Sequence, residues 1–162
     1  MIIGVLSDTH GTIHPRLLPT FREAGVQLIL HAGDVGDPAV LETLSSIAEV
    51  VAVRGNVDNE GMSVGGTAEL PEEIRKTWNG VDIYMTHIGD KPKVWIRALS
   101  NPKPQVAICG HSHVSLLEKL GGVLFLNPGS AGTRPRFGGT FSAALLTVEN
   151  GKVAAELIDF GR

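Results

Sequence analysis

Residues 2–10 of the chain read IIGVLSDTH, an apolar run that ends abruptly in polar residues. A run of this kind, about five residues long, is typical of a strand buried on both faces. A helix signal with Pro15 in its first turn follows, and we expect a helix through Leu17 and Phe21 that ends at Gly25. A buried strand followed at once by a helix begins a parallel α/β unit.

The same pattern continues to residue 55. Residues 26–30 and 49–53 are two further apolar runs, and Asp37-Pro38 between them supplies an N-cap and a first helical residue. Strand, helix, strand, helix and strand with short connections predict parallel strands joined by right-handed crossovers.

The second half carries hairpin signals. Asn79-Gly80 and Asn150-Gly151 are two-residue hairpin turns flanked by apolar or alternating runs. We expect a loop over 61–68, a helix over 94–99, strands over 81–85 and 106–109, and four antiparallel strands over 116–119, 123–126, 141–148 and 153–158. The sequence thus predicts a single domain over residues 1–162, with a mixed pair of β-sheets flanked by helices.

The composition of the chain argues against several classes of function. The 14 lysines and arginines against 17 aspartates and glutamates give a net charge of −3, which disfavours generalised binding to nucleic acid or to an anionic membrane. The one cysteine, Cys109, excludes an internal disulfide framework and a sulfur-ligated zinc site. The N-terminus lacks the basic start of a signal peptide, and no apolar run approaches the roughly 18 residues of a membrane span. We therefore expect a cytoplasmic protein.

Residues able to bind metals follow five of the expected strands. They are Asp8 and His10, Asp34, Asn56, His87, and His111 with His113. Ligands of open α/β sheets collect outside the carboxyl ends of the strands, so these side chains are expected at one edge. Glycines precede Asp34, Asn56 and His111, where they let the backbone turn sharply and bring side chains close together.

Each piece alone has an ordinary explanation, as turn chemistry or as a structural histidine. Together they predict a metal site, and seven candidates exceed what one four- to six-coordinate ion needs, which argues for two ions. Manganese, iron, cobalt, nickel and zinc all suit imidazole, carboxylate and amide ligands. Two ions about 3.5–4 Å apart serve in-line displacement at phosphorus, where they activate a water or hydroxide.

In this order, Asp8-Thr9-His10, Gly33-Asp34, Gly55-Asn56, His87 and Gly110-His111-Ser112-His113 resemble the signature of the calcineurin-like metallophosphoesterases. Chain length and the Asn127-Pro128-Gly129-Ser130 segment resemble the small prokaryotic phosphodiesterase branch. The resemblance implies a four-layer αββα sandwich and a phosphodiesterase that uses two divalent ions, with Mn²⁺ expected. One ion would take Asp8, His10, Asp34 and His113, and the other Asp34, Asn56, His87 and His111. Asp34 would bridge the two ions, and Asp34, Asn56 and His87 would be catalytic.

The sequence departs from the family pattern after Asn56. Many relatives carry a histidine at the next position, where it is thought to assist the leaving group, whereas this chain has Val57 followed by Asp58. The departure predicts a preference for substrates with acidic leaving groups. Arg134 and Arg136 are candidates for binding the phosphate of a small phosphoester substrate, because arginine suits bidentate phosphate recognition.

Two other interpretations remain open. The chain could be a non-catalytic interaction or scaffold protein on this fold, like the metallophosphoesterase-fold subunit of the retromer coat, although such proteins can lose ligands and none is missing here. A single-zinc amidohydrolase-like enzyme would leave Asn56 and the second pair of histidines unused. His31 is expected to have a supporting or structural role. A homo-oligomer is left open.

Overall fold

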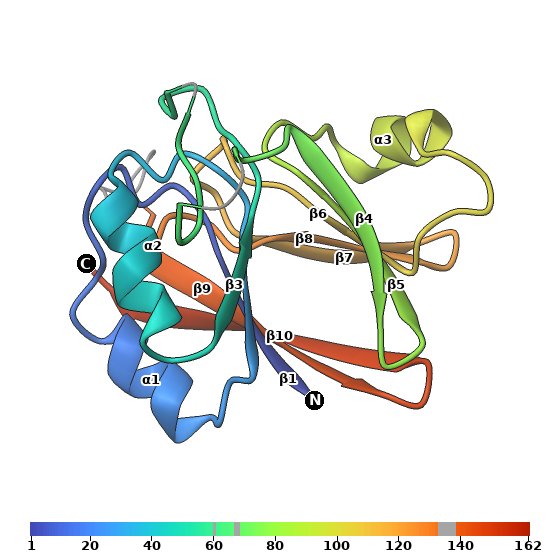
Figure 1. Ribbon diagram of the computed structural model, residues 1–162. Helices are drawn as coiled ribbons and strands as arrows, with labels where there is room; N and C mark the ends of the chain where they lie inside the picture. The colour runs from blue at the N-terminus through green and yellow to red at the C-terminus, as the bar shows by residue number, and fades with distance from the viewer. Residues whose placement is uncertain (60, 67–68, 133–138) are drawn as a thin grey trace.

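The computed structural model describes residues 1–59, 61–66, 69–132 and 139–162, which form two five-stranded mixed sheets and three helices (Figure 1). The first sheet has the order β10-β9-β1-β2-β3 and the second β4-β5-β6-β8-β7. The strands of the first sheet are β1 (Ile2–Leu6), β2 (Leu28–His31), β3 (Glu49–Ala52), β9 (Phe141–Glu149) and β10 (Lys152–Gly161). Those of the second are β4 (Glu73–Trp78), β5 (Val81–Thr86), β6 (Val106–Ile108), β7 (Leu116–Leu120) and β8 (Val123–Asn127). The helices are α1 (Leu17–Glu23), α2 (Pro38–Ser45) and α3 (Pro92–Ala98).

Three apolar cores separate the layers. α1 and α2 pack on the outer face of the first sheet, where Phe21 and Leu41 are fully or almost fully buried. A middle core lies between the two sheets, and α3 covers the outer face of the second sheet through Trp95. Strand alternation divides the side chains, so that Ile108 of β6 faces the middle core and Ala107 the core under α3. The αββα sandwich expected from the sequence is confirmed.

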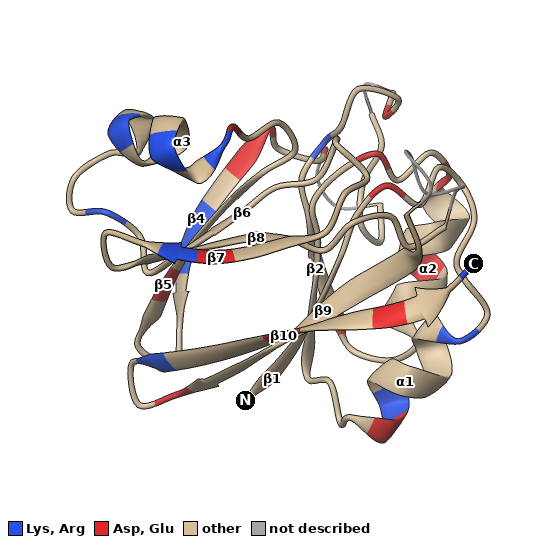
Figure 2. Cartoon of the chain, turned by 180° about the vertical axis from the view of Figure 1, so that it is seen from behind, with Lys and Arg blue, Asp and Glu red and all other residues tan. Residues whose placement is uncertain are grey.

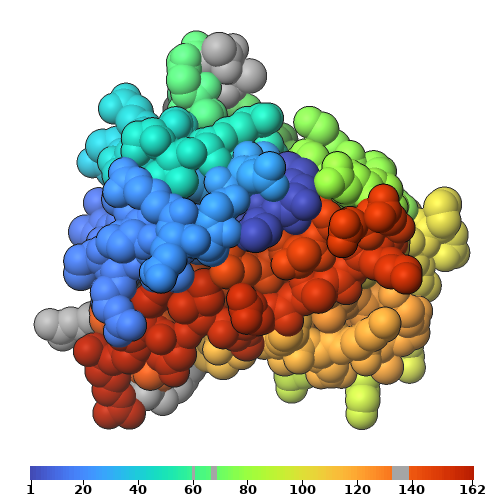
Figure 3. Space-filling model, turned by 90° about the horizontal axis from the view of Figure 1, so that it is seen from below, coloured from blue at the N-terminus to red at the C-terminus, as the bar shows by residue number. Residues whose placement is uncertain are grey.

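The two sheets also meet along one side through their C-terminal strands. Figure 3 shows the β9–β10 hairpin as a red band across the lower face, between the N-terminal helices and the orange β7–β8 hairpin. Lys and Arg residues concentrate on α3 and on outer strands of the second sheet, whereas acidic residues recur in the loops above the sheets (Figure 2). Among the described residues, no helix is long and apolar enough to span a membrane.

The fold differs from the sequence expectation in four places. α1 begins at Leu17 with Arg16 as its N-cap, so Pro15 precedes the helix instead of lying in its first turn. β8 pairs with β7 in antiparallel fashion but with β6 in parallel, so it is only in part the antiparallel strand expected. α3 begins at Pro92 instead of residue 94. A residue in the first turn of a helix needs no backbone N–H, so proline, which lacks one, is accommodated there. β4 was not expected, since this strand is polar and only half-buried at most, yet Asn79-Gly80 joins it to β5 as the hairpin signal predicts.

Candidate metal centre

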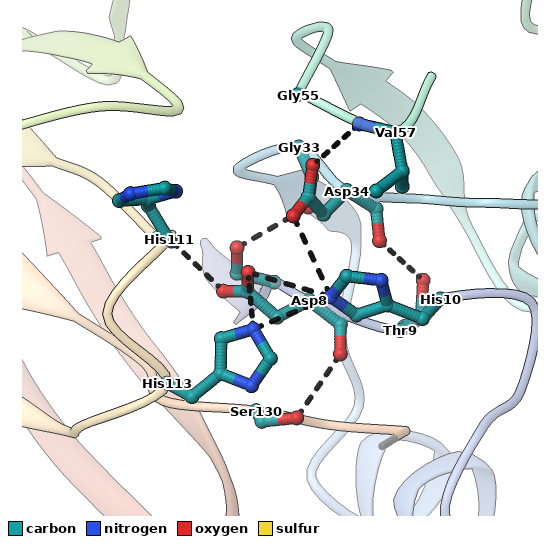
Figure 4. Close-up of polar contacts among 12 residues, drawn as sticks. Asp8, Thr9, His10, Gly33, Asp34, Gly55, Val57, His111, His113 and Ser130 are labelled. Atoms are coloured by element: carbon teal, nitrogen blue, oxygen red, sulfur yellow. Dashed lines mark hydrogen bonds and ion pairs between the residues drawn. The ribbon is translucent and has the colours of Figure 1, made fainter. Parts of the chain in front are cut away.

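The seven metal-binding residues expected from the sequence follow β1, β2, β3, β5 and β6. β1, β2 and β3 run parallel, as do β5 and β6, so within each sheet these strands end at the same edge. Within each sheet a backbone bond joins neighbouring loops: Asp8 N–H donates to Gly33 O and Gly110 N–H donates to His87 O, each with 3.0 Å between N and O. Between the sheets, His87 Nδ1 donates to Ala32 O at 2.8 Å and His111 N–H donates to Asp8 Oδ2 at 3.0 Å. The loops after both sheets therefore converge on one site (Figure 4).

Four of the seven residues form a compact cluster. One ligand atom from each of Asp8, His10, Asp34 and His113 lies within 4.8 Å of all the others. His113 Nε2 is 3.2 Å from Asp8 Oδ1, and His10 Nε2 is 3.5 Å from Asp34 Oδ2 and 3.3 Å from His113 Nε2 (Figure 4). Imidazole nitrogens and carboxylate oxygens converging at these separations match the ligand set of a divalent transition metal.

The second oxygen of Asp34 faces a different imidazole. Asp34 Oδ1 is 3.3 Å from Nε2 of the buried His87, whose Nδ1 must donate to Ala32 O at 2.8 Å because a carbonyl only accepts. Nε2 of a neutral His87 ring therefore points a lone pair at the carboxylate, and it makes no regular hydrogen bond among the described residues. A cation between these two atoms would satisfy both, so the residues fit a metal ion here.

Asn56 and His111 flank this second position without joining the compact cluster. Both residues are exposed. The His111 ring lies edge-on to the His87 ring, with 5.3 Å between the centroids, and Asn56 lines a cavity of about 300 Å³ together with His87. The backbone N–H of His111 donates to Asp8 Oδ2 at 3.0 Å (Figure 4), so its loop also orients a carboxylate of the first cluster.

Opposing electrostatic effects act on Asp34 and His87. Burial raises the pKa of Asp34, but the interaction with the nearby His87 imidazole and the hydrogen bond from the Val57 N–H bring that pKa well below its usual range. Burial lowers the pKa of His87, and the interaction with Asp34 outweighs it, so the net shift is upward. A positive charge between these two side chains is therefore stabilised by the site.

The backbone of the site is strained. Seven non-glycine residues among those described have a left-handed φ, and two of them belong to the Asn-Gly hairpins. The other five are Asp8 (55°), His10 (47°), Asp34 (54°), His111 (67°) and His113 (58°). Such conformations cost of the order of 1–3 kcal/mol each and persist only where surrounding contacts enforce them. Strain is thus concentrated in the candidate metal-binding residues.

The three glycines noted in the sequence do bring the loops close together, but mainly by a different route. Only Gly33 has a left-handed φ, at 88°. A Cβ at Gly55 would overlap the backbone of Asp34, and one at Gly110 would overlap the Ser7 hydroxyl. At these two positions the missing side chain matters for close approach and not for a turn.

Two residues of segment 127–130 support the site in a way that the sequence did not reveal. Asn127 Nδ2 donates to Gly110 O at 2.7 Å, and Ser130 Oγ donates to Asp8 O at 3.0 Å (Figure 4). Both residues are polar and lie at or just after the end of the apolar strand β8, which is the one local signal that could have drawn attention to them. Their partners are 17 and 122 residues away, so no local pattern identifies them.

Asp58 and His31 are also supporting residues. Asp58 is 8% exposed, and its two oxygens accept from the N–H groups of Gly36 at 2.9 Å and Gly55 at 2.7 Å. Its carboxylate therefore joins the loop after Asp34 to the loop before Asn56. His31 is fully buried with Nε2 2.9 Å from Thr9 Oγ1, and burial lowers its pKa to about 4. Arg134 and Arg136 lie outside the described residues.

Replacing Asp58 by asparagine should loosen the site although Asp58 is no metal ligand. The amide has one acceptor oxygen, so its NH₂ group would face one of the two backbone donors, an unmade bond that costs about 1–3 kcal/mol. Urea unfolding should show a loss of that size, and titration calorimetry should show about tenfold weaker metal binding. The exposed Glu42→Gln variant on α2 is the matched control. Wild-type stability and metal affinity in Asp58→Asn would contradict this role.

Comparisons with known proteins identify the family and the fold of the chain. The family model of the calcineurin-like phosphoesterase superfamily domain matches residues 1–151. A probable metallophosphoesterase of Methanocaldococcus jannaschii is 37% identical over 84% of this chain and 70% of its own length. Phosphodiesterase YfcE of Escherichia coli is 30% identical over 86% of this chain and 84% of its own. The crystal structure of a single mutant of Vps29 from Entamoeba histolytica has the same fold, with a TM-score of 0.77 at 24% identity over 99% of this chain and 100% of that chain. The chain therefore belongs to the calcineurin-like phosphoesterase superfamily.

Proposed function

We propose that the protein is a metal-dependent phosphodiesterase that holds two divalent metal ions. The observation that carries this proposal is the Asp34 carboxylate, which directs Oδ2 toward His10 and Oδ1 toward His87. A carboxylate with an imidazole on each side is suited to bridging two cations. Membership of the superfamily and the phosphodiesterase names of relatives support the same reaction class.

We assign Asp8, His10, Asp34 and His113 to one ion and Asp34, Asn56, His87 and His111 to the other. Mn²⁺ is the ion we expect, with iron, cobalt, nickel and zinc also suited to these ligands. Bound divalent ions supply Lewis acidity to the phosphate and lower the pKa of a water molecule. Ala32 O fixes the tautomer of His87 through Nδ1, so that Nε2 is free to act as a ligand. Asp34, Asn56 and His87 are the residues we regard as catalytic.

An open cavity beside the second ion position suits a small phosphoester substrate. Asn56 and His87 line this cavity, whose volume is about 300 Å³. Phosphoryl transfer depends mostly on positioning and charge stabilisation. A site built from several rigid strand ends meets that demand, since the contacts described above hold each loop. Arg134 and Arg136 stay candidates for phosphate binding.

A scaffold function is the second candidate, because Vps29 shares the fold. That likeness is one of fold alone. The complete set of seven ligand residues favours the enzyme, since a scaffold has no need of a shared carboxylate with imidazoles on both sides. Metal-dependent hydrolysis distinguishes the two functions.

The proposal is tested by loading the metal-free protein with each divalent ion in turn and screening chemically diverse phosphoesters. We expect hydrolysis of phosphodiesters that requires metal and is highest near two ions per chain. Chelation should abolish turnover and leave the circular dichroism spectrum largely unchanged, because a core of this size is stable alone. One ion per chain in active, saturated protein would overturn the two-ion proposal, and no turnover with any ion would favour a scaffold.

A ranked series of alanine variants should follow from the shared carboxylate. Asp34→Ala should reduce metal occupancy most, since it removes a ligand from both ions, and Asn56→Ala should reduce it less, since it removes one neutral oxygen. His87→Ala and His10→Ala should weaken different ions. His14→Ala is the control, because that ring stacks on Phe160 with 5.1 Å between centroids. Metal content and affinity are the readouts, and equal harm from His14→Ala and Asp34→Ala would show that the site is misplaced.

Val57 should govern the dependence on the leaving group. A general acid in the right place raises the rate roughly 10²–10⁴-fold for a poor leaving group. Val57 cannot supply a proton, and both oxygens of Asp58 already accept backbone hydrogen bonds, so neither residue provides this acid. The wild-type rate should therefore fall steeply as leaving-group pKa rises from aryl to alkyl diesters. Val57 is 45% exposed, so Val57→His can be accommodated and should flatten that slope. A flat wild-type slope, with chemistry shown to limit the rate, would mean that another group is the acid.

A further inference from the structure

The cavity beside the candidate metal centre is lined by one positively charged side chain that the proposed chemistry does not use. Arg54 lines this cavity together with Asn56 and His87. It is the only lysine or arginine among the described residues that line it. Its backbone N–H donates to Pro71 O at 2.8 Å, which fixes the end of β3 against the segment before β4. Arg54 is thereby fixed at a position two residues before Asn56, a candidate metal ligand.

The side chain of Arg54 has one weak partner. Its Nη2 donates to Glu72 Oε1 at 2.9 Å, and within the described part of the chain this is the only hydrogen bond of the guanidinium. Arg54 is 29% exposed and Glu72 is 81% exposed. Ion pairs this open to solvent contribute about 0–1 kcal/mol, so Glu72 is easily displaced by a better anion. Four of the five N–H donors of Arg54 stay available for that anion.

A phosphate group is the anion that such a site fits best. Guanidinium groups bind phosphate bidentately through charge-assisted hydrogen bonds that are about twice as strong as neutral ones. A volume of about 300 Å³ accommodates one phosphate group and the atoms that connect it to a phosphodiester at the metal centre. The exposed aliphatic side chain of Ile88 lines the same cavity and can contact that connecting part.

We propose that Arg54 forms a subsite for a second phosphate group of the substrate, and that Glu72 pairs with this guanidinium until the substrate phosphate displaces it. The preferred substrate is then a phosphodiester that carries another phosphate nearby, as in a nucleotide with phosphates on two positions of the sugar. This inference rests on the proposed phosphodiesterase function. Arg54 is a binding residue in it, and Glu72 is a competitor for Arg54.

The test uses two matched esters, 4-nitrophenyl thymidine 5′-phosphate with and without a 3′-phosphate, and the Mn²⁺-loaded protein. Both should release 4-nitrophenol, and the ester with the 3′-phosphate should have the lower KM. Arg54→Ala should raise that KM about tenfold to hundredfold and change the KM of the other ester less than about twofold. Glu72→Gln should act in the opposite direction and lower the KM of the 3′-phosphate ester about two- to fivefold. Arg97→Ala, an exposed arginine on α3, should leave both values unchanged.

The opposite signs separate a binding role from a structural one. If the pair only fastened β3 to the following segment, Arg54→Ala and Glu72→Gln would impair the protein in the same direction and with both esters. Titration calorimetry with thymidine 3′,5′-bisphosphate and thymidine 5′-monophosphate gives a readout independent of turnover, and the bisphosphate should lose its advantage in Arg54→Ala. Equal KM and Kd values for the two members of each pair would overturn the subsite. Failure to hydrolyse either ester would instead count against the phosphodiesterase function, and the binding titration would still decide the subsite.

Discussion

The carboxylate of Asp34 is the group on which the organisation of the site depends. It lies at the end of β2, the strand between β1 and β3 in the first sheet, and its two oxygens face imidazoles from different sheets. Burial raises the pKa of such a carboxylate, but the Val57 N–H and His87 lower it well below its usual range. A fixed negative charge with an imidazole on each side stabilises positive charge between these side chains. The sandwich architecture matters for function because it places β2 and β5 where this shared contact can form.

Holding that charge in place requires a backbone that ordinary loops do not adopt. Five of the seven candidate metal-binding residues have a left-handed φ, at a cost of about 1–3 kcal/mol each. The cost is offset by contacts that bring no chemistry themselves. Asp58 joins the loops of Asp34 and Asn56, and Asn127 and Ser130 hold the loops of His111 and Asp8. The rigidity of the site is therefore a property of the whole edge where the strands end.

For the proposed phosphodiesterase, rigid ligand loops leave the neighbouring cavity as the place where substrates would be distinguished. The candidate metal-binding residues are the same types as in the family signature, whereas Val57 and the pair of Arg54 with Glu72 are features of the surroundings. An exposed arginine with a displaceable carboxylate partner can respond to a substrate without disturbing the strands. In the proposed enzyme, chemistry and selectivity are carried by separate parts of the site.

Local sequence patterns determined most of the fold and named the candidate site. Apolar runs, an Asp-Pro helix start and two Asn-Gly turns predicted the layers, because strand burial, helix capping and hairpin turns depend on residues close in the chain. The polar residues after five strands were identifiable for the same reason. Three features depended on the tertiary structure: the parallel pairing of β8 with β6, the supporting bonds of Asp58, Asn127 and Ser130, and the pairing of Arg54 with Glu72. Each joins groups that are brought together only when strands and loops pack. A periodic pattern indicates which face of an element is buried, but it does not indicate which distant group that face will contact.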